Sequence, residues 1–422
     1  MQRYCIELPK GCARGPGDFK PADRIALAAV LPLTAGGARD ESEYAGLNAF
    51  SLAIDEMNQQ GGAGSGRVFA LWVCDTQRVT DVTKAQASWL AEKLQVPAML
   101  TSGSQQSLDV SEATRSFGTM IMSPTATSPT LVAQFHSNAQ DLLWRTAPPD
   151  TLQGRVLANL LLTDPTYTGV SRVGIIYVGD AYGQGLFSEL RNRLMNMRTV
   201  VSAPFTSGMD VSAAVNGLGN PQPVDATVVI GVTSDTKNIL TAAFAKPELG
   251  RDAGHQWAFA DASKDPDILT VPGARFQLAG SLGTAPAQGA GVPYPAFRDA
   301  YRVKFGIDPS SFSFTSHSYD AMYLVGLAAS YASSNGRTLN GRTMAEGMTK
   351  IISTGPAVNL EPASFSSMRN TISAGQSLNV EGNSGKLDYI PDAGAPYSLI
   401  EQWRVEPDGG FSIVNLIDPP TN

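Results

Sequence analysis

Short apolar runs alternate with helical patterns along the first part of the chain. Apolar stretches predict strands over residues 25–31, 67–73, 96–100 and 119–122. Apolar residues at helical spacing predict helices over residues 44–59 and 81–94. Strands that are apolar throughout are typical of a parallel sheet with helices on both faces. The pattern therefore predicts an α/β lobe built on a doubly wound sheet.

The same alternation starts again after Arg145. It predicts strands over residues 173–178, 199–205, 226–230 and 257–260, and helices over 152–162, 186–194 and 236–244. Two successive series predict two Rossmann-like lobes. The remainder is less regular and predicts a strand over 276–282, helices over 294–305 and 318–331, a long loop over 354–385, and a hairpin of 397–404 with 411–415.

Length and charge narrow the class of protein. A chain of 422 residues exceeds the usual single domain, which agrees with two lobes. The net charge of −7 argues against a nucleic-acid partner, which needs a clustered basic face. Residues 1–24 contain no apolar stretch, so this form shows no signal peptide. Either the protein is cytosolic or a leader has been removed.

The three cysteines leave the compartment open. Cys5 and Cys12 are seven residues apart in a Gly/Pro-rich segment, where a small disulfide loop could form in an oxidising compartment. Cys74 follows an apolar run, so we expect an inert buried thiol there.

Catalytic signals are sparse. The histidines His136, His255 and His317 are isolated and lack the spacing of metal ligands. The sequence contains no nucleophile elbow, no Cys-His signature and no dinucleotide-binding fingerprint. We therefore expect no metal, no cofactor and no enzymatic activity.

Polar turns follow several predicted strands, where doubly wound sheets bind their ligands. Residues 101–107 and 123–129 are rich in Ser and Thr, and amides at a helix start attract anions, so a carboxylate would fit there. The alternative is that Ser104 and Thr127 only cap helices. In the second series, Tyr182 could offer an aromatic face and a hydroxyl, and Asp261 could pair with an ammonium group. Alternatively, both are ordinary surface turn residues.

Several stretches in order resemble one known family. They are IALAAVLPLT, LAIDEMNQQGG, SGSQQS, MSPTATSP, LWRTAPPD, VGIIYVGDAYGQGL and HSYDAMYL, with EGNSGKLDY near the end. The chain resembles a type I periplasmic binding protein, in the branch that binds leucine, isoleucine and valine. The first 23 residues and the 354–385 segment have no clear counterpart in that family.

The resemblance implies a set of ligand-binding residues. The family's carboxylate-binding serine falls on Ser104, and its Ser-Pro-x-Ala-Thr pair falls on Thr125 and Thr127. The aromatic wall falls on Tyr182, and the acid that meets the ligand ammonium falls on Asp261. The branch often has an aromatic residue where this chain has Val232 and Thr233, so the pocket shape differs. The full expected set is Ser104, Gln105, Thr125, Ala126, Thr127, Tyr182, Val232, Thr233 and Asp261.

The resemblance also implies an architecture and a role. It implies two Rossmann-like lobes joined by a multi-strand hinge, with the chain crossing near Arg145, Gly283 and Gln376. The expected domains are an N-terminal extension over 1–23, lobe 1 over 24–145 plus 283–376, and lobe 2 over 146–282 plus 377–422. The implied protein is a periplasmic or surface-exposed monomer. It would capture an amino acid or related carboxylate between its lobes and deliver it to an ABC permease. The rival is a sensing receptor of the same fold, with an enzyme as a distant third.

Overall fold

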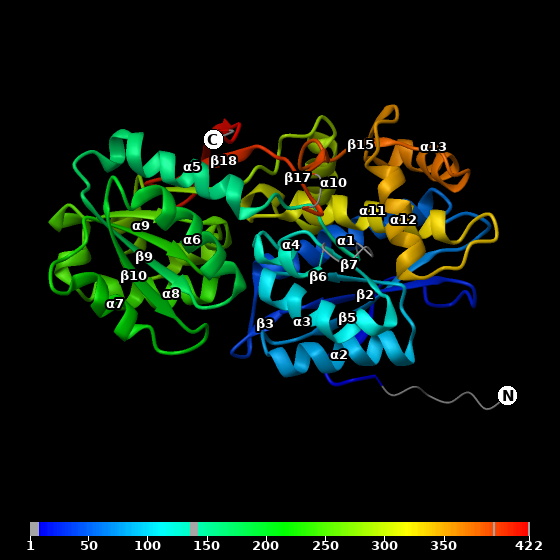
Figure 1. Cartoon of the computed structure of the whole chain (residues 1–422), viewed down its shortest axis with the longest axis horizontal. Helices are drawn as coiled ribbons and strands as arrows, with labels where there is room; N and C mark the ends of the chain where they lie inside the picture. Colours follow the sequence, from blue (N-terminus) through cyan, green and yellow to red (C-terminus); the bar gives the residue numbers. More distant parts are fainter. Residues whose placement is uncertain (1–7, 136–141, 391–392, 421–422) are drawn as a thin grey trace. The chain divides into compact units, whose positions relative to one another are not determined.

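The computed structural model describes residues 8–135, 142–390 and 393–420, so Cys5 and His136 lie outside the described residues. The chain divides into two compact units (Figure 1). Unit 1 comprises Met1–Ala126, Gln134–Thr146 and Ser316–Asn383, and unit 2 comprises Thr127–Ala133, Ala147–Thr315 and Ser384–Asn422. Each unit has its own sheet.

The unit 1 sheet has the strand order β1-β5-β2-β6-β7-β8. Its parallel strands are β2 (Ile25–Leu31), β5 (Phe69–Asp75), β6 (Ala98–Thr101), β7 (Met120–Ser123) and β8 (Leu143–Arg145), and β1 (Cys12–Gly17) is antiparallel to β5. The central strand β2 is buried along almost its whole length because helices cover both faces.

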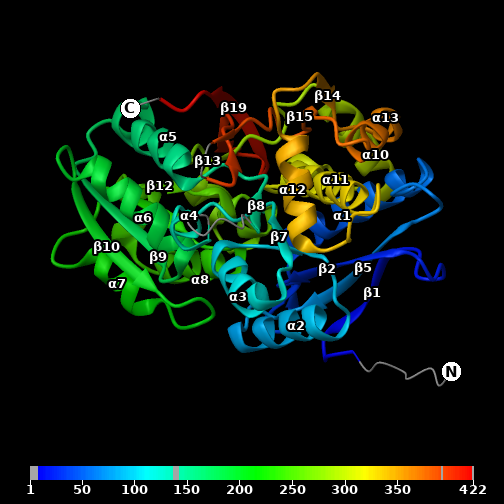
Figure 2. The same ribbon diagram turned by 45° about the vertical axis from the view of Figure 1, so that its right-hand side comes forward.

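The helices of unit 1 divide between the two faces of this sheet. The first, α1 (Glu41–Gln59), lies on one face, and α2 (Thr80–Lys93) and α3 (Ser104–Thr114) lie on the other (Figure 2). Asp40 caps α1 by accepting a hydrogen bond from the Glu43 amide at 3.2 Å. Further along the chain α11 (Thr315–Ala332), α12 (Gly341–Ile351), β14 (Ala357–Asn359), α13 (Pro362–Ser373) and β15 (Asn379–Glu381) complete the unit.

The unit 2 sheet has the order β10-β9-β11-β12-β13-β18-β19. Its parallel strands are β9 (Arg172–Val178), β10 (Thr199–Phe205), β11 (Ala226–Ile230), β12 (Gln256–Phe259) and β13 (Leu282–Pro286), and the final hairpin of β18 (Ile400–Val405) and β19 (Phe411–Ile417) adds two antiparallel strands. Its longer helices include α5 (Asp150–Thr163), α6 (Ala181–Leu194), α7 (Ser212–Gly219), α8 (Thr233–Phe244) and α10 (Tyr294–Phe305).

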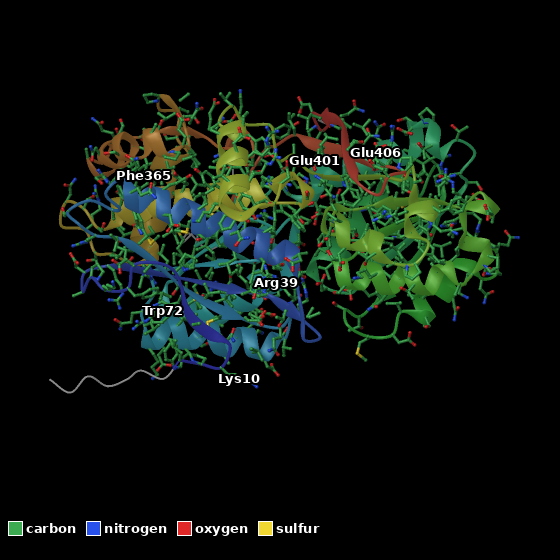
Figure 3. The ribbon with its side chains drawn as sticks, turned by 180° about the vertical axis from the view of Figure 1, so that it is seen from behind. Lys10, Arg39, Trp72, Phe365, Glu401 and Glu406 are labelled. Atoms are coloured by element: carbon green, nitrogen blue, oxygen red, sulfur yellow. A yellow bond between two sulfur atoms is a disulfide. The ribbon has the colours of Figure 1, made fainter. Side chains whose placement is uncertain are left out.

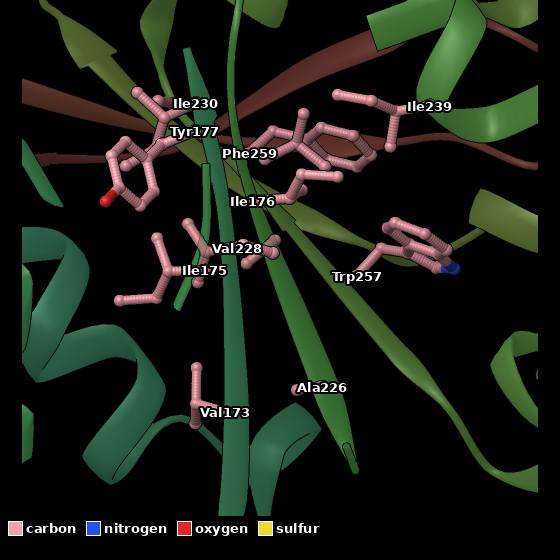
Figure 4. Packing of buried hydrophobic residues seen from close by; sticks show 14 of the residues in the cluster. Val173, Ile175, Ile176, Tyr177, Ala226, Val228, Ile230, Ile239, Trp257 and Phe259 are labelled. Carbon is pink, nitrogen blue, oxygen red and sulfur yellow. The ribbon is translucent and has the colours of Figure 1, made fainter. Parts of the chain in front are cut away.

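The core of unit 2 lies between these strands and helices. Figure 4 shows Ile175 and Ile176 of β9 beside Val228 of β11, and Phe259 of β12 next to Ile176. All four side chains are fully buried. Strands buried on both faces account for the unbroken apolar runs in the sequence, so the predicted fold class of two doubly wound α/β lobes is confirmed.

Two predictions of secondary structure are wrong. The predicted strand over 276–282 is the short helix α9 (Ala274–Leu278) followed by β13, because Gly280, with φ of 85°, makes a turn between them. The predicted loop over 354–385 contains β14, α13 and β15. Its helix buries Phe365, Met368 and Ile372 at helical spacing, a pattern that the surrounding Ser and Asn residues hide in the sequence.

The expectation about the cysteines is also wrong. A disulfide joins Cys12 to Cys74, so Cys74 is not a free thiol and Cys12 does not pair with Cys5. Strand β1 places Cys12 directly opposite Cys74 of β5. The segment 12–17 is rich in Gly and Pro and does not resemble a strand, so its pairing with β5 could not be predicted. Phe19 continues this contact by packing edge-on against Trp72 of β5, with ring centroids 4.7 Å apart. Trp72 is labelled in Figure 3.

The chain changes unit after Thr146, beside the predicted crossing near Arg145, and also after Thr315 and Asn383. Residues 283–315 group with unit 2, and β13 pairs there with β12 and β18. Gly283 is needed in this place because a Cβ atom would lie 2.2 Å from the Trp403 ring. The predicted crossings and domain boundaries stay predictions. No helix among the described residues is long and apolar enough to cross a membrane.

Candidate functional site

A cluster of Ser and Thr residues, all buried except the half-buried Thr125, lies at the carboxyl ends of β6 and β7 in unit 1. Ser107 contacts Thr101 Oγ1 at 2.8 Å and donates to the Gly103 carbonyl at 2.7 Å. Its hydroxyl oxygen also lies 3.1 Å from Ser123 Oγ. Thr125 Oγ1 accepts a hydrogen bond from the Gly103 amide at 2.5 Å and lies 3.1 Å from Ser102 Oγ. These bonds hold the two polar turns beside each other; we call Thr101, Ser102, Ser107, Ser123 and Thr125 the hydroxyl cluster.

The helix α3 begins directly at this cluster. Gly103 has φ of 78°, a conformation that L side chains rarely adopt, and it lets the chain turn sharply from β6 into α3. Ser104 is the first residue of the helix and is buried. Gln105 is half-buried, and its amide donates to Asp109 at 3.3 Å along the helix. The start of α3 therefore combines the backbone amides of a helix N-terminus with a buried serine hydroxyl, and both kinds of group can donate hydrogen bonds to an anion.

The turn after β7 holds Ala126 and Thr127 in fixed positions. The Ala126 amide donates to Ser123 Oγ at 3.2 Å, and its carbonyl accepts from the buried Arg145 guanidinium at 3.3 Å. The Thr127 carbonyl accepts from the Asp150 amide at 2.8 Å. Both residues are fully buried. The unit boundary falls between them, with Ala126 in unit 1 and Thr127 in unit 2.

An acidic residue that the sequence analysis missed adjoins the hydroxyl cluster. Glu43, in the first turn of α1, accepts a hydrogen bond from Ser102 Oγ at 2.8 Å. Its side chain is only 13% exposed, and burial together with the nearby Asp40 carboxylate raises its pKa to about 7. Acids are common in the first turn of any helix, so the sequence held no signal that distinguishes Glu43.

Unit 2 contains a second polar cluster, built around Asp261. This residue follows β12 and is 2% exposed. Its Oδ1 atom accepts hydrogen bonds from the Tyr182 hydroxyl at 2.7 Å and from the Gln153 amide at 3.0 Å. We call Asp261, Tyr182 and Gln153 the Asp261 cluster. Gln153 was missed because one polar residue on an amphipathic helix is unremarkable in sequence.

The electrostatics of this cluster follow from its burial. Burial raises the pKa of Asp261, and the hydrogen bonds from Tyr182 and Gln153 oppose that rise. Burial and the nearby Asp261 carboxylate raise the pKa of Tyr182, so its hydroxyl stays protonated and donates. The hydrogen bonds from Tyr182 and Gln153 favour the ionised form of Asp261, and an ionised carboxylate in this position is suited to pair with a positively charged group.

Neighbouring residues hold Tyr182 and Asp261 in position. Asp180 caps α6 by accepting from the amides of Tyr182 and Gly183, each at 3.0 Å. Gly183 lets the helix start close to β9, because a Cβ atom would lie 1.9 Å from the Val178 carbonyl. Lys264, which follows the Asp261 turn, forms a buried ion pair with Glu401 of β18 and ties the turn to the sheet.

Val232 and Thr233 lie at the start of α8, after β11. Val232 is the N-cap residue and is half-buried. The Thr233 hydroxyl donates to Asp265 at 3.0 Å, so it contributes to the fold of this loop. Its other expected role, in shaping a ligand pocket, stays a prediction.

The predicted site residues thus fall into two groups. Unit 1 holds Ser104, Gln105, Thr125 and Ala126, and unit 2 holds Thr127, Tyr182, Val232, Thr233 and Asp261. Each group lies where parallel strands end and helices begin. The chemistry on offer is hydrogen bonding to an anion in unit 1 and pairing with a cation in unit 2. Within the described part of the chain, no group of three or more His, Cys, Asp or Glu side chains could hold a metal ion.

Two doubly wound units, each with polar groups at its strand ends, define a two-lobed α/β protein of the solute-binding class. The chain belongs to the periplasmic binding protein family, whose model matches residues 24–369. The resemblance found in the sequence is thereby confirmed.

Individual relatives agree with this assignment. The chemotactic signal transduction system substrate-binding protein BasB of Halobacterium salinarum is 26% identical over 398 residues, or 93% of this chain and 87% of the relative. The leucine binding protein LivK of Thermotoga maritima superposes with a TM-score of 0.73 at 18% identity, over 94% of this chain and 99% of its own.

Two solved relatives contain ligands. LivJ of Streptococcus pneumoniae, in complex with isoleucine, has a TM-score of 0.72 at 19% identity and covers 94% of this chain and 100% of its own. A solute binding protein of Rhodopseudomonas palustris, in complex with 3,4-dihydroxybenzoic acid, has a TM-score of 0.70 at 16% identity, covering 94% and 98%. At these identities the structures show the shared fold. The family implies a periplasmic or extracellular location.

Proposed function

We propose that this chain is a non-enzymatic solute-binding protein that captures a small carboxylate, such as an amino acid, with one half-site on each lobe. The observation that carries the proposal is the Asp261 cluster, a buried carboxylate held by Tyr182 and Gln153 in hydrogen bonds of 2.7 and 3.0 Å. The hydroxyl cluster and Ser104 would bind the ligand carboxylate, and Asp261 would bind its ammonium group. Gln105, Ala126, Thr127, Val232 and Thr233 would complete the set.

The disulfide supports an extracytoplasmic location. Disulfides persist in oxidising compartments and are rare in the cytosol. The Cys12–Cys74 bond therefore favours a periplasmic or surface-exposed location. We further propose that the protein acts as a monomer and delivers its ligand to an ABC permease.

A ligand panel tests capture. We expect the ligand-free protein to bind one or more of L-leucine, L-isoleucine, 4-hydroxybenzoate and 3,4-dihydroxybenzoate in isothermal titration calorimetry. A bound ligand at 100 times its Kd should stabilise the protein by about 2.7 kcal/mol in thermal unfolding. Chemical conversion of the ligand over time would instead reveal an enzyme. If none of these compounds binds, the proposal is contradicted.

A sensing role is the second candidate, favoured by the likeness to a chemotaxis substrate-binding protein. Deleting the gene separates the two roles. Loss of uptake of the radiolabelled ligand would support delivery to a permease. Loss of the chemotactic response with normal uptake would support sensing.

A further inference from the structure

We propose that Glu43 determines specificity at the unit 1 half-site, by carrying a proton when that half-site holds a ligand carboxylate. Capture of an anionic ligand would then take up one proton from solution. This inference rests on the proposed function, because it concerns the same half-site and the same ligand class. It adds a residue and a means of regulation that neither the motif positions nor the family likeness provides.

The contacts of Glu43 place it next to the expected carboxylate site. Glu43 Oε1 accepts from Ser102 Oγ at 2.8 Å, and Ser102 Oγ lies 3.1 Å from Thr125 Oγ1. Thr125 is one of the residues expected to bind the ligand carboxylate. One serine hydroxyl therefore separates Glu43 from that site, and two carboxylates this close repel each other unless a proton lies between them.

The charged groups around Glu43 do not remove this repulsion. Among the described groups that shift the pKa of Glu43, Arg78 is the cation and Asp40 is the other acid. Arg78 Nη2 lies 2.7 Å from Asp40 Oδ2 but 3.7 Å from Glu43 Oε1, so it mainly neutralises Asp40. Asp75, at the end of β5, accepts from Thr34 Oγ1 at 2.7 Å. An ionised Glu43 thus adds a net negative charge beside the half-site.

The protonation state of Glu43 is balanced near neutrality. Burial raises its pKa to about 7, so both forms are present in the ligand-free protein. The protonated form is neutral and can donate a hydrogen bond, which a carboxylate ligand accepts. A bound carboxylate raises the pKa of Glu43 further, so binding takes up a proton. Affinity should therefore fall as pH rises above about 7, approaching tenfold per pH unit.

Binding at different pH values tests the inference. The Kd of L-leucine, or of the tightest compound in the panel, would be measured by calorimetry from pH 5.5 to 8.5. We expect the wild-type affinity to fall above pH 7. Glu43→Gln, which imitates the protonated form, should keep a nearly constant affinity. The matched control is Glu41→Gln on the same helix, because Glu41 is half-exposed and pairs with Arg39; it should follow the wild type.

A second measurement counts the protons. At pH 7.5 a group with a pKa of about 7 is already roughly one-quarter protonated before binding, so titrations in two buffers of different ionisation enthalpy should show up to about three-quarters of a proton taken up per ligand by the wild type and by Glu41→Gln. Glu43→Gln should take up almost none. A wild-type Kd that does not change with pH, or equal proton uptake by both variants, would overturn the inference and leave capture intact. A wild-type affinity that rises with pH, together with lost affinity in Glu43→Gln, would also overturn the inference. In that case the ionised Glu43 carboxylate would bind a cationic group of the ligand.

Stability without ligand gives an independent readout. A folded-state pKa above the ordinary Glu value means that the folded protein holds more protons between pH 4.5 and about 7. Wild-type Tm should therefore fall relative to Glu43→Gln as pH rises through this interval. Parallel profiles would show that Glu43 holds no proton near neutrality and would overturn the inference whatever the ligand. No binding by any variant at any pH would contradict the proposed function, while this profile still decides the protonation of Glu43.

Discussion

At the scale of single residues, whether a polar side chain could be predicted as part of the site depends more on its position directly after a strand than on its residue type. Asp261 and Tyr182 are far apart in sequence, yet both follow parallel strands of one sheet, and a hydrogen bond of 2.7 Å joins them. Both residues could be predicted because apolar runs in the sequence mark where the strands end. Gln153 and Glu43 could not be predicted, because their contacts depend on the packing of α5 in unit 2 and of α1 in unit 1.

Removing the Asp261 carboxylate should weaken binding of an amino acid. Loss of one partner of a buried ion pair costs roughly 3–5 kcal/mol, so the Kd of Asp261→Ala for an amino-acid ligand should rise more than a hundredfold. Calorimetry would measure this. The Asp261→Asn variant isolates the effect of the charge, because it keeps the shape of the side chain and a hydrogen-bonding oxygen but loses the negative charge. An aromatic acid without an ammonium group should lose much less affinity; an equal loss for both ligands would mean that Asp261 does not meet a cation.

Ser104 and Thr127 should act together on the ligand carboxylate. Charge-assisted hydrogen bonds contribute about 1.5–3 kcal/mol each, so Ser104→Ala and Thr127→Val should each weaken binding at least tenfold. One anion shares both donors, so the double variant should lose less than the sum. The ligand's amide analogue serves as the control, since it should distinguish poorly between variant and wild type. Fully additive losses, or equal losses for acid and amide, would leave both residues as helix caps.

At the scale of elements, the disulfide between β1 and β5 should matter for stability rather than for binding. It closes a separation of 62 residues, and constraining a loop of that size in the unfolded chain is worth about 4 kcal/mol in the chain-entropy model. Cys12→Ser and Cys74→Ser should each lower the free energy of unfolding by up to that amount, as measured by chemical denaturation. The ligand Kd should change little.

Cys5→Ser is the control for this prediction. Cys5 does not take part in the Cys12–Cys74 bond, so its substitution should leave unfolding unchanged. A loss of stability in Cys5→Ser that matches the loss in Cys12→Ser would contradict the observed pairing.

A helix or strand could be predicted only where its own sequence carries a recognisable apolar or helical pattern. Strand β9 spans Arg172–Val178 where the sequence predicts 173–178, because a strand buried on both faces is apolar throughout. Helix α10 spans Tyr294–Phe305 as predicted. Strand β1 was missed because its Gly/Pro-rich sequence pairs only through its position opposite β5. The hydroxyl cluster could be located as polar turns, but its internal hydrogen bonds depend on β6 and β7 lying side by side.

At the scale of the whole molecule, the division into two units predicts how ligand affects unfolding. Each unit has its own sheet, so differential scanning calorimetry of the ligand-free protein can resolve separate transitions. A ligand that binds groups on both units stabilises both, so both transitions should move up together. Asp261→Ala in unit 2 and Ser104→Ala in unit 1 serve as matched controls, because each removes a proposed ligand-binding group from one unit only. A shift confined to one transition would mean that a single half-site holds the ligand.

The antiparallel strand β1 has a further consequence, for self-association. It covers the edge of β5, whose residues Phe69–Cys74 are apolar and buried, and the disulfide holds it there. An uncovered, long apolar edge strand invites pairing with another chain. At the edge of the other sheet, β10 carries Pro204 and several exposed positions, which hinder such pairing. Reducing the disulfide would thus open one route to aggregation, through β5, while the β10 edge stays protected by its own sequence.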